Sequence, residues 1–332
     1  MKKMHRARLT ELISAFSTRR ILVAGDLMLD EFVWGRVSRI SPEAPVPVVE
    51  VVSESAYPGG AANVARNLRE FTPHADLIGM AGADPAGARL LELLNGRGIG
   101  TAGVLIAPGQ RTIVKTRVIA RQQQVVRVDR DSRASIGEDT LRQVRTQLEA
   151  CIAQTDAIIF ADYGKGFLTQ EVVELIASIA RPHGKIMVVD PNPSNPVHWR
   201  EMTAIKPNRI ETAAALGAPL DPDPRSLREG AQKLQAKWAT GIILITLGEH
   251  GMWLFDGDQE PYHTAARAKE VFDVSGAGDT AIALFTLALA SGATAREAAE
   301  IANLASGVVV GKLGTATLTP ADLLSALLTS AA

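Results

Sequence analysis

Short runs of β-branched and apolar residues recur along the chain and alternate with longer segments that have the character of helices. The runs "ILVAG", "ADLIGMAG", "AIIFAD", "KIMVVD" and "GIILITLG" begin at Ile21, Ala75, Ala157, Lys185 and Gly241. Apolar runs of this length predict buried strands. Helices are predicted between them, for example over residues 60–71, 84–98 and 169–184. The alternation predicts a three-layer α/β fold, in which helices cover both faces of a mostly parallel sheet.

Two regions, at about residues 31–53 and 101–130, break this alternation. Each contains short strands with no helix between them, as in "RTIVKTRVIARQQQVVRVDRD" from Arg111. That pattern predicts a small antiparallel sheet with one exposed face. We expect the two insertions to form one β lid. Because no stretch has the composition of a linker, residues 1–332 are expected to form a single domain.

Composition excludes several classes of protein. Lys and Arg total 35 against 36 Asp and Glu, so neither nucleic acid nor an anionic membrane is expected as a partner. Cys151 is the single cysteine, which excludes an intramolecular disulfide and favours a core role. The N-terminus lacks the apolar region of a signal peptide, and the apolar run 281–290 is shorter than the roughly 18 residues of a membrane span. We therefore expect a cytoplasmic protein.

The segment "DVSGAGDT", residues 273–280, lies between a predicted strand and a predicted helix. Gly276 and Gly278 leave the backbone unobstructed where the helix begins, so successive N–H groups can point at one anion. Asp279 falls in the first helical turn, where the helix dipole favours its ionised form. An ionised carboxylate beside an anion hole suits phosphoryl transfer to a hydroxyl, with the carboxylate as general base.

The same segment also fits an ordinary Gly-rich helix start with Asp as a cap. Other nucleotide-binding motifs are missing. The sequence "GVVVGKL" at Gly307 has three residues between its glycines and Leu313 after the Lys, so it is not a Walker A motif. The first strand continues into "GDLMLD" and not into G-x-G-x-x-G, which argues against a nicotinamide oxidoreductase.

Two motifs in the right order give the chain a family resemblance. The segment "DVSGAGDT" matches the C-terminal signature of the ribokinase-like (PfkB) carbohydrate kinases, and "YPGGAANVARNL", from Tyr57, matches their N-terminal Gly-Gly signature. From about Ile21 to Leu318 the chain resembles this family. The resemblance implies the ribokinase-like fold with its β lid, and a sugar kinase that uses ATP and Mg²⁺.

The resemblance implies a role for each motif residue. Asp279 matches the catalytic base, and the backbone N–H groups of Gly276, Ala277 and Gly278 match the anion hole. The sugar-binding set is Asp30, Gly59, Gly60 and Asn63. Asn208 and Glu211, in an N-x-x-E motif, are expected near Mg²⁺ and the ATP phosphates, through water. The nucleotide wall is expected from Thr246, Gly248, Gly251 and Asn303.

These residues also have simpler interpretations. Asp30 could close a turn, Gly59 and Gly60 could shape a helix start, and Asn63 could lie on a helix surface. The N-x-x-E pair could be a capping box, because that motif has the same spacing. The glycines of "LGEHG" could belong to a plain hairpin, and Asn303 to an ordinary helix.

The stretch "SRISPEAPVPVVEV", from Ser38, adds a narrower resemblance. With "VAGDLMLDEFVWG" and "ADYGKG", it is similar to the D-glycero-D-manno-heptose 7-phosphate kinases, which phosphorylate the anomeric hydroxyl in ADP-heptose and lipopolysaccharide synthesis. A phosphorylated substrate calls for cations, and Lys115, Arg117 and Arg121 share one side of a predicted strand, where a solvated lid face is the alternative. Further substrate candidates, with a turn as the alternative, are Asp162, Tyr163 and Lys165.

The resemblance leaves several points open. The nearest alternative is a kinase for another sugar, sugar phosphate or nucleoside, and a noncatalytic sugar-phosphate sensor is an alternative of another class. K⁺ activates many members, and no residue here decides whether it is needed. A lid with an apolar face and free edges predicts a homodimer that pairs lids. Many relatives continue into an adenylyltransferase domain; the end at Ala332 predicts the monofunctional form.

Overall fold

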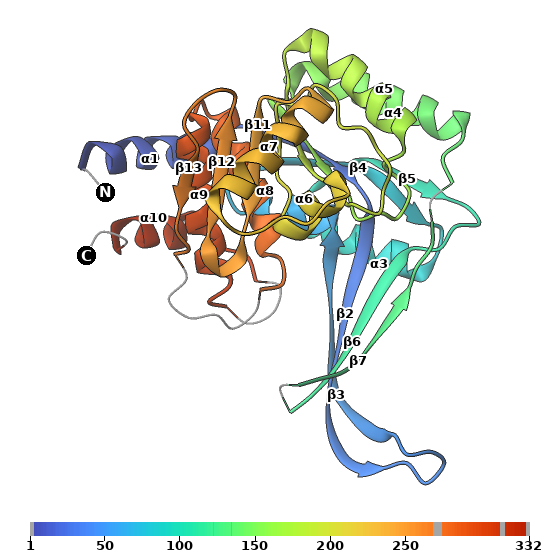
Figure 1. Cartoon of the computed structure of the whole chain (residues 1–332). Coiled ribbons are helices and arrows are strands. Elements are labelled where there is room, and N and C mark those ends of the chain that lie inside the picture. The colour runs from blue at the N-terminus through green and yellow to red at the C-terminus, as the bar shows by residue number, and fades with distance from the viewer. Residues whose placement is uncertain (1–2, 122, 134, 268–273, 313–315, 330–332) are drawn as a thin grey trace.

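A computed structural model describes residues 3–121, 123–133, 135–267, 274–312 and 316–329, which form two β-sheets and the helices around the larger one (Figure 1). Within these residues the larger sheet has nine strands. They are β1 (Arg20–Gly25), β4 (His74–Gly82), β5 (Gly100–Ala107), β8 (Ala157–Ala161), β9 (Ile186–Asp190), β10 (Ala204–Ile205), β11 (Ile242–Thr246), β12 (Met252–Asp256) and β13 (Tyr262–Thr264).

The spatial order of these strands is β13-β12-β11-β10-β9-β8-β1-β4-β5. All neighbours from β11 to β5 are parallel, and β12 and β13 add an antiparallel edge. The mostly parallel sheet expected from the sequence is therefore confirmed. The chain proceeds from β1 to β4 and β5 on one side and then to β8 on the other, so the order reverses beside β1. Open sheets of this kind bind ligands at the carboxyl ends of the strands near such a reversal.

Helices cover both faces of the sheet and complete three layers. One face carries α1 (Lys3–Ala15), α2 (Ala61–Arg69), α3 (Pro85–Asn95), α8 (Ala277–Ala290), α9 (Ala295–Val309) and α10 (Pro320–Thr329). The other carries α4 (Glu138–Cys151), α5 (Gln170–Ala180), α6 (Arg209–Leu216) and α7 (Pro224–Trp238). In β1, Val23 packs into the first core and Leu22 into the second, because successive side chains of a strand point to opposite faces.

The smaller sheet is the lid, made of β2 (Leu27–Ile40), β3 (Pro47–Gly60), β6 (Ile113–Ala120) and β7 (Gln123–Arg130) in the order β3-β2-β6-β7. It projects away from the helices, and the β2–β3 hairpin reaches furthest (Figure 1). Each insertion forms an antiparallel hairpin, as expected, but β2 and β6 pair in parallel. Both strands leave the large sheet from the carboxyl ends of parallel strands, so they run outward in the same direction.

Two expectations about the second insertion are wrong. Residues 101–107, assigned to the lid, form most of β5 at the edge of the large sheet, and the lid resumes at Ile113. As an edge strand, β5 has exposed side chains between buried ones, much as a lid strand does, so the pattern could not separate the two. Arg121, expected on one strand face with Lys115 and Arg117, follows β6 in the turn and has φ 49°.

Two further expectations concern single features. No helix within the described ranges has the length and apolar character needed to cross a bilayer. Cys151 lies half-buried at the end of α4, where its Sγ contacts the Leu148 carbonyl at 3.5 Å and burial raises the pKa of the thiol. A protonated, partly buried thiol agrees with the packing role proposed for it.

Candidate active site

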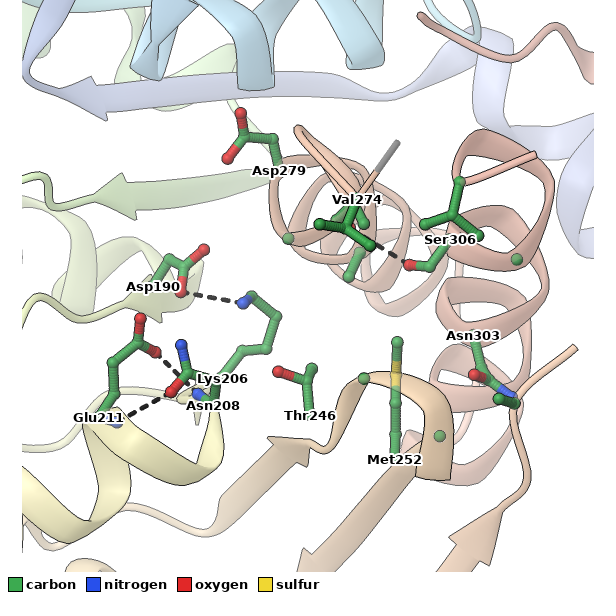
Figure 2. Close-up of a pocket in the computed structure, with 18 of the residues that line it drawn as sticks. Asp190, Lys206, Asn208, Glu211, Thr246, Met252, Val274, Asp279, Asn303 and Ser306 are labelled. Atoms are coloured by element: carbon green, nitrogen blue, oxygen red, sulfur yellow. Dashed lines mark hydrogen bonds and ion pairs between the residues drawn. The ribbon is translucent and has the colours of Figure 1, made fainter. Parts of the chain in front are cut away.

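The carboxyl ends of β8 to β11 and the start of α8 surround a cavity of about 540 Å³, a volume typical of small-molecule sites. Figure 2 shows side chains from these elements around it. Many residues proposed from the sequence line this cavity: Asp162, Tyr163, Asn208, Glu211, Thr246, Gly248, Gly251, Ala277, Gly278, Asp279 and Asn303. The structure thus brings together motifs that are far apart in the chain.

Helix α8 begins at Ala277, and Gly276 precedes it as the N-cap with φ 82°. This left-handed conformation favours Gly and turns the chain sharply into the helix. The N–H groups of the first turn, from Ala277 to Asp279, have no partner within the helix. The Ala277 N–H donates to the Val274 carbonyl at a long 3.3 Å. Gly278 and Asp279 therefore offer the backbone donors best suited to an anion in the cavity.

Both carboxylate oxygens of Asp279 accept hydrogen bonds. Asn63 Nδ2 donates to Oδ2 and the Tyr163 hydroxyl donates to Oδ1, each at 2.6 Å. Burial raises the pKa of Asp279 to about 6, and the nearby Asp190 carboxylate adds to the rise, while the two hydrogen bonds oppose it. Asp279 is thus mostly ionised at neutral pH, with a basicity well above that of an exposed Asp.

An ion pair that the sequence analysis did not assign lies opposite Asp279. Lys206 Nζ is 2.9 Å from Asp190 Oδ1, and the Lys206 side chain is 3% exposed. Burial alone would lower the pKa of Lys206, but the carboxylates of Asp190, Glu211 and Asp279 raise it. Figure 2 shows its ammonium group between Asp190 and the start of α8. A buried cation there can attract the phosphates of a nucleotide.

Asn208 and Glu211 form the capping box of α6. Asn208 Oδ1 accepts from the Glu211 N–H at 2.9 Å, and Glu211 Oε2 accepts from the Asn208 N–H at 2.7 Å. The simpler interpretation of the N-x-x-E motif is therefore present in the structure. Both residues nevertheless line the cavity, and burial raises the pKa of Glu211 even though Lys206 opposes the rise. Capping uses one of the two Glu211 carboxylate oxygens and one lone pair of the single Asn208 amide oxygen, which leaves the other Glu211 oxygen and the second lone pair of Asn208 Oδ1 for a ligand.

The oxygen atoms of this region suit a divalent cation that is held mainly by its ligands. No group of three or more His, Cys, Asp or Glu side chains within the described ranges could hold a metal alone. Mg²⁺ commonly uses one or two carboxylates together with water and substrate phosphates. Glu211 and Asn208 provide oxygens of the right kind, and the pKa of Asp190 is raised to about 6 by burial, with Lys206 opposing and Glu211 adding to the shift. An added cation would relieve this concentration of negative charge.

The expected nucleotide wall lies on the side of the cavity away from the lid. Gly248 starts a short 3-10 helix, Gly248–His250, with φ 57°. A Cβ on Gly251, which has φ 79°, would lie 2.0 Å from the Thr264 carbonyl oxygen. Asn303 is 4% exposed and donates to Thr264 Oγ1 at 2.9 Å and to the Ala265 carbonyl at 2.7 Å. These residues shape the wall through the backbone, and Asn303 holds the segment after β13.

Asp30, the first of the expected sugar-binding residues, is 7% exposed at the base of the lid. Arg117 Nη1 donates to Asp30 Oδ1 at 2.5 Å, and the Arg117 guanidinium lies over the Phe32 ring. A Cβ on Gly59 would lie 2.1 Å from Asp30 Oδ2, so any larger residue here would displace this carboxylate. Gly60 has φ 59° and is the N-cap of α2, which carries Asn63 to Asp279. Asp30 is therefore part of a charged pair and not merely a turn residue.

The other two lid cations differ from Arg117. Lys115 Nζ is 3.2 Å from Asp129 Oδ2, and this ion pair is partly buried within the lid. Arg121 lies in the exposed turn after β6. Of the three cations proposed to hold a substrate phosphate, Arg117 is thus the one joined to a predicted sugar-binding residue.

The segment "DYGKG", residues 162–166, is organised by two buried carboxylates. Asp162 accepts from the Gly164 N–H at 2.9 Å and from Asn195 Nδ2 at 3.0 Å, and burial raises its pKa to about 6. Asp26 accepts from the N–H groups of Tyr163 and Lys165, each at 3.0 Å. Lys165 Nζ pairs with Asp131 Oδ2, just beyond β7, at 2.6 Å. Asp162 therefore stabilises a turn, whereas Tyr163 contacts the proposed base.

Comparison with known proteins agrees with this geometry. A sequence model of the pfkB family of carbohydrate kinases matches residues 18–322. The bifunctional protein HldE of Desulfatibacillum aliphaticivorans is 44% identical over 311 residues, which cover 94% of this chain and 63% of that protein. HldE of Caulobacter vibrioides is 44% identical over 316 residues, covering 95% and 65%. The chain thus spans slightly less than two thirds of these relatives.

Solved structures show the same fold. Arabidopsis thaliana ribokinase complexed with ribose and ATP superposes with a TM-score of 0.73 at 17% identity, covering 93% of this chain and 99% of that one. Phosphofructokinase-2 from Escherichia coli in complex with potassium gives 0.75 at 21% identity, covering 94% and 98%. The family match, the fold and the carboxylate at the start of α8 lead to one conclusion: the chain belongs to the pfkB family of carbohydrate kinases.

Proposed function

We propose that the protein transfers the γ-phosphoryl group of ATP to the anomeric hydroxyl of D-glycero-D-manno-heptose 7-phosphate and forms the 1,7-bisphosphate, a precursor of ADP-heptose for lipopolysaccharide. The observation that carries the proposal is Asp279, held by Asn63 and Tyr163 beside a helix N-terminus and facing Lys206. The relatives named HldE, 44% identical over most of the chain, and the motifs shared with heptose 7-phosphate kinases support this acceptor.

Asp279 would act as general base. Its carboxylate takes the proton of the anomeric hydroxyl while that oxygen forms a bond to the γ-phosphorus. The bond from phosphorus to the β,γ-bridging oxygen breaks at the same time, and ADP leaves. A loose transition state of this type needs only a weak base, which matches a pKa of about 6.

Positive charge and backbone donors would stabilise the transferring group. Gly278 and Asp279, in the first turn of α8, line the cavity, and the Cβ position of Gly278 is 3.9 Å from Lys206 Nζ. These donors and the ammonium can therefore contact one phosphoryl group. Bound Mg²⁺, held by Asn208 and Glu211 through water, would neutralise charge on the ATP phosphates. Thr246, Gly248, Gly251 and Asn303 would form the wall for the rest of the nucleotide.

The acceptor would lie between the base and the lid. Asp30, with Gly59 and Gly60 beside it, can accept sugar hydroxyls, and Asn63 can bind the sugar as well as Asp279. Arg117 is the cation best placed for the distal phosphate, because it is the one paired to Asp30. Dependence on ATP and on a metabolic sugar phosphate also favours a cytoplasmic location.

The first experiment measures ADP release from Mg-ATP by the purified protein. Heptose 7-phosphate is compared at equal concentration with ribose, fructose, fructose 6-phosphate and adenosine. A strong preference for the heptose phosphate is expected. Preference for another acceptor would support kinase activity but refute heptose 7-phosphate as the substrate. No turnover with any of these acceptors would favour a sugar-phosphate sensor.

Asp279→Asn tests the base. Loss of a general base typically costs about 10²- to 10⁴-fold in rate, and the kcat of the variant should fall in this range. ATP affinity, measured by calorimetry, should stay within about twofold of the wild type, since the amide preserves the shape of the site. Near-wild-type turnover would show that another group accepts the proton.

The lid would also form a homodimer interface. Its surface exposes large apolar side chains, including Ile40, Val51, Val52 and Val126, each 47–64% exposed. Apolar patches of this kind often mark protein–protein contacts. Light scattering at micromolar concentration should give twice the chain mass, and Val52→Glu should produce monomers. A monomeric wild type would refute pairing through the lid.

A further inference from the structure

We propose that Tyr163 is a positioning residue, whose phenolic hydroxyl fixes the plane of the Asp279 carboxylate for proton transfer. The proposal rests on the function of Asp279 as base. It assigns to Tyr163 a task other than sugar binding, because its hydroxyl lies 2.6 Å from Oδ1 of Asp279.

The two oxygens of the carboxylate have donors from different parts of the fold. Tyr163 follows β8 and donates to Oδ1, whereas Asn63 on α2 donates to Oδ2, also at 2.6 Å. Rotation of the Asp carboxylate about its terminal torsion is otherwise only weakly restricted. Two donors on opposite oxygens hold one plane, so that a remaining lone pair faces the acceptor hydroxyl. A base held in the reacting geometry avoids the entropy cost of orienting it.

The backbone of Tyr163 is itself held in place by the buried carboxylate of Asp26. Its backbone N–H donates to Oδ2 of Asp26 at 3.0 Å, and the N–H of Phe167 donates to Oδ1 of the same carboxylate at 3.0 Å. Asp26 is 2% exposed, so the loop is anchored inside the protein. Gly164 and Gly166, with φ of 68° and 99°, allow the chain to curl around this carboxylate. The hydroxyl of Tyr163 is therefore presented from a fixed loop.

The chemistry of the phenol also suits a fixed donor. Burial and the neighbouring carboxylates of Asp279 and Asp190 raise the pKa of Tyr163 well above its ordinary value. The hydroxyl keeps its proton at every pH at which the enzyme would work. It cannot replace Asp279 as base, but it can donate a hydrogen bond throughout the reaction.

The test is Tyr163→Phe, which keeps the ring and its packing and removes only the hydroxyl. A hydrogen bond to an ionised group favours the ionised form, so its loss should raise the pKa of Asp279 by about one unit from about 6. NMR of protein labelled with ¹³C-aspartate measures that pKa directly. The Asp279 carboxyl signal is the one that disappears from the spectrum of Asp279→Asn. The kcat at pH 7 should fall about tenfold, as for loss of one hydrogen bond to a charged group.

Tyr262→Phe is the matched control. Its hydroxyl donates to Glu300 Oε1 at 2.5 Å, so the variant also removes a Tyr–carboxylate bond, but Tyr262 does not line the cavity. This control should leave the Asp279 titration and kcat unchanged. An unchanged Asp279 titration in Tyr163→Phe would overturn the proposal. A raised titration midpoint without a matching shift of the pH–rate profile would confirm the contact and refute Asp279 as the base.

Discussion

Asn63 donates a 2.6 Å hydrogen bond to Asp279 across 216 positions of sequence. The bond joins the Gly-Gly segment at the start of α2 to the Gly-rich start of α8. The group that would bind the sugar is thus in direct contact with the group that would remove its proton. The protonation state of the Asp279 carboxylate should therefore affect the kcat/KM measured for the acceptor.

The pH dependence of kcat/KM should show an acid limb with a midpoint of about 6, because the proposed base Asp279 would act only when ionised and burial raises its pKa to about 6. Activity should fall as pH drops through this value and stay level between pH 7 and 8. ADP release measured from pH 5 to 8.5 checks it. A slope steeper than one proton would show that a second carboxylate must be ionised as well, and Asp190 and Asp162 both have a pKa of about 6. Full activity at pH 5 would contradict the assignment.

Gly59→Ala should impair acceptor binding. The added Cβ would lie 2.1 Å from Asp30 Oδ2, so the carboxylate must move. Displacement of a positioning group by an ångström can cost about 10²-fold, and a loss of this order is expected in kcat/KM for the acceptor. The KM for ATP should change little. Gly241→Ala is the control, because nothing lies within 4 Å of its added Cβ. Equal effects of both variants would show that Gly59 acts only through stability.

Arg117→Met should raise the KM for the acceptor by about tenfold or more, as expected for a lost charge-assisted hydrogen bond. Comparison of phosphorylated and unphosphorylated acceptors separates two roles. A phosphate clamp requires a larger effect on the phosphorylated one, whereas orientation of Asp30 affects both equally. Arg121→Ala, in the exposed turn, should remain close to wild type. A larger effect at Arg121 than at Arg117 would reverse this ranking of the lid cations.

Lys206→Met should lower kcat by about 10²- to 10³-fold, the usual cost of removing one donor to a developing charge. The single variant also leaves Asp190 without its 2.9 Å partner. The double variant Lys206→Met/Asp190→Asn removes that unpaired carboxylate and serves as the control. If the double variant turned over at the wild-type rate, Lys206 would have a structural role and no role in transfer.

Asn208→Ala should lower stability by about 1 kcal/mol, the typical cost of losing a helix cap. Thr294→Ala is its matched control, because Thr294 and Glu297 form the same capping box on α9 away from the cavity. Both variants should lose similar stability in urea unfolding, and only Asn208→Ala should raise the KM for Mg-ATP. Equal KM values for Mg-ATP in the two variants would show that the N-x-x-E motif acts only as a helix cap.

Most helices and strands could be predicted from the sequence, because apolar runs and glycines at helix ends are local patterns. Many of the residues predicted for the site also line one cavity, and their roles there stay predictions. The sequence did not predict the Lys206–Asp190 pair. Asp190 is the last residue of β9 and Lys206 directly follows β10, but nothing local shows that the two strands are neighbours. A charged residue at the carboxyl end of a buried strand was the available signal.

The pKa values of the site residues could not be predicted from the sequence either. The helix dipole predicts an Asp279 carboxyl that is easily ionised, yet burial outweighs the dipole and raises the pKa to about 6. Burial of Asp279 depends on residues that are distant in the chain, such as Asn63 and Tyr163, and a sequence does not show that they meet. The same limit applies to Arg117. Its place on a face of β6 was predicted, but its ion pair with Asp30 depends on the parallel register of β2 and β6, which the sequence does not show.

That register makes the lid a single mechanical unit. Hydrogen bonds join β2 to β6 from Met28–Ile113 to Gly35–Ala120, so two hairpins from distant parts of the chain share one continuous sheet. A ligand that displaced one hairpin would therefore be expected to displace the other. Binding of the acceptor at Asp30 and binding of its charged end at Arg117 would then shift the same four-stranded sheet.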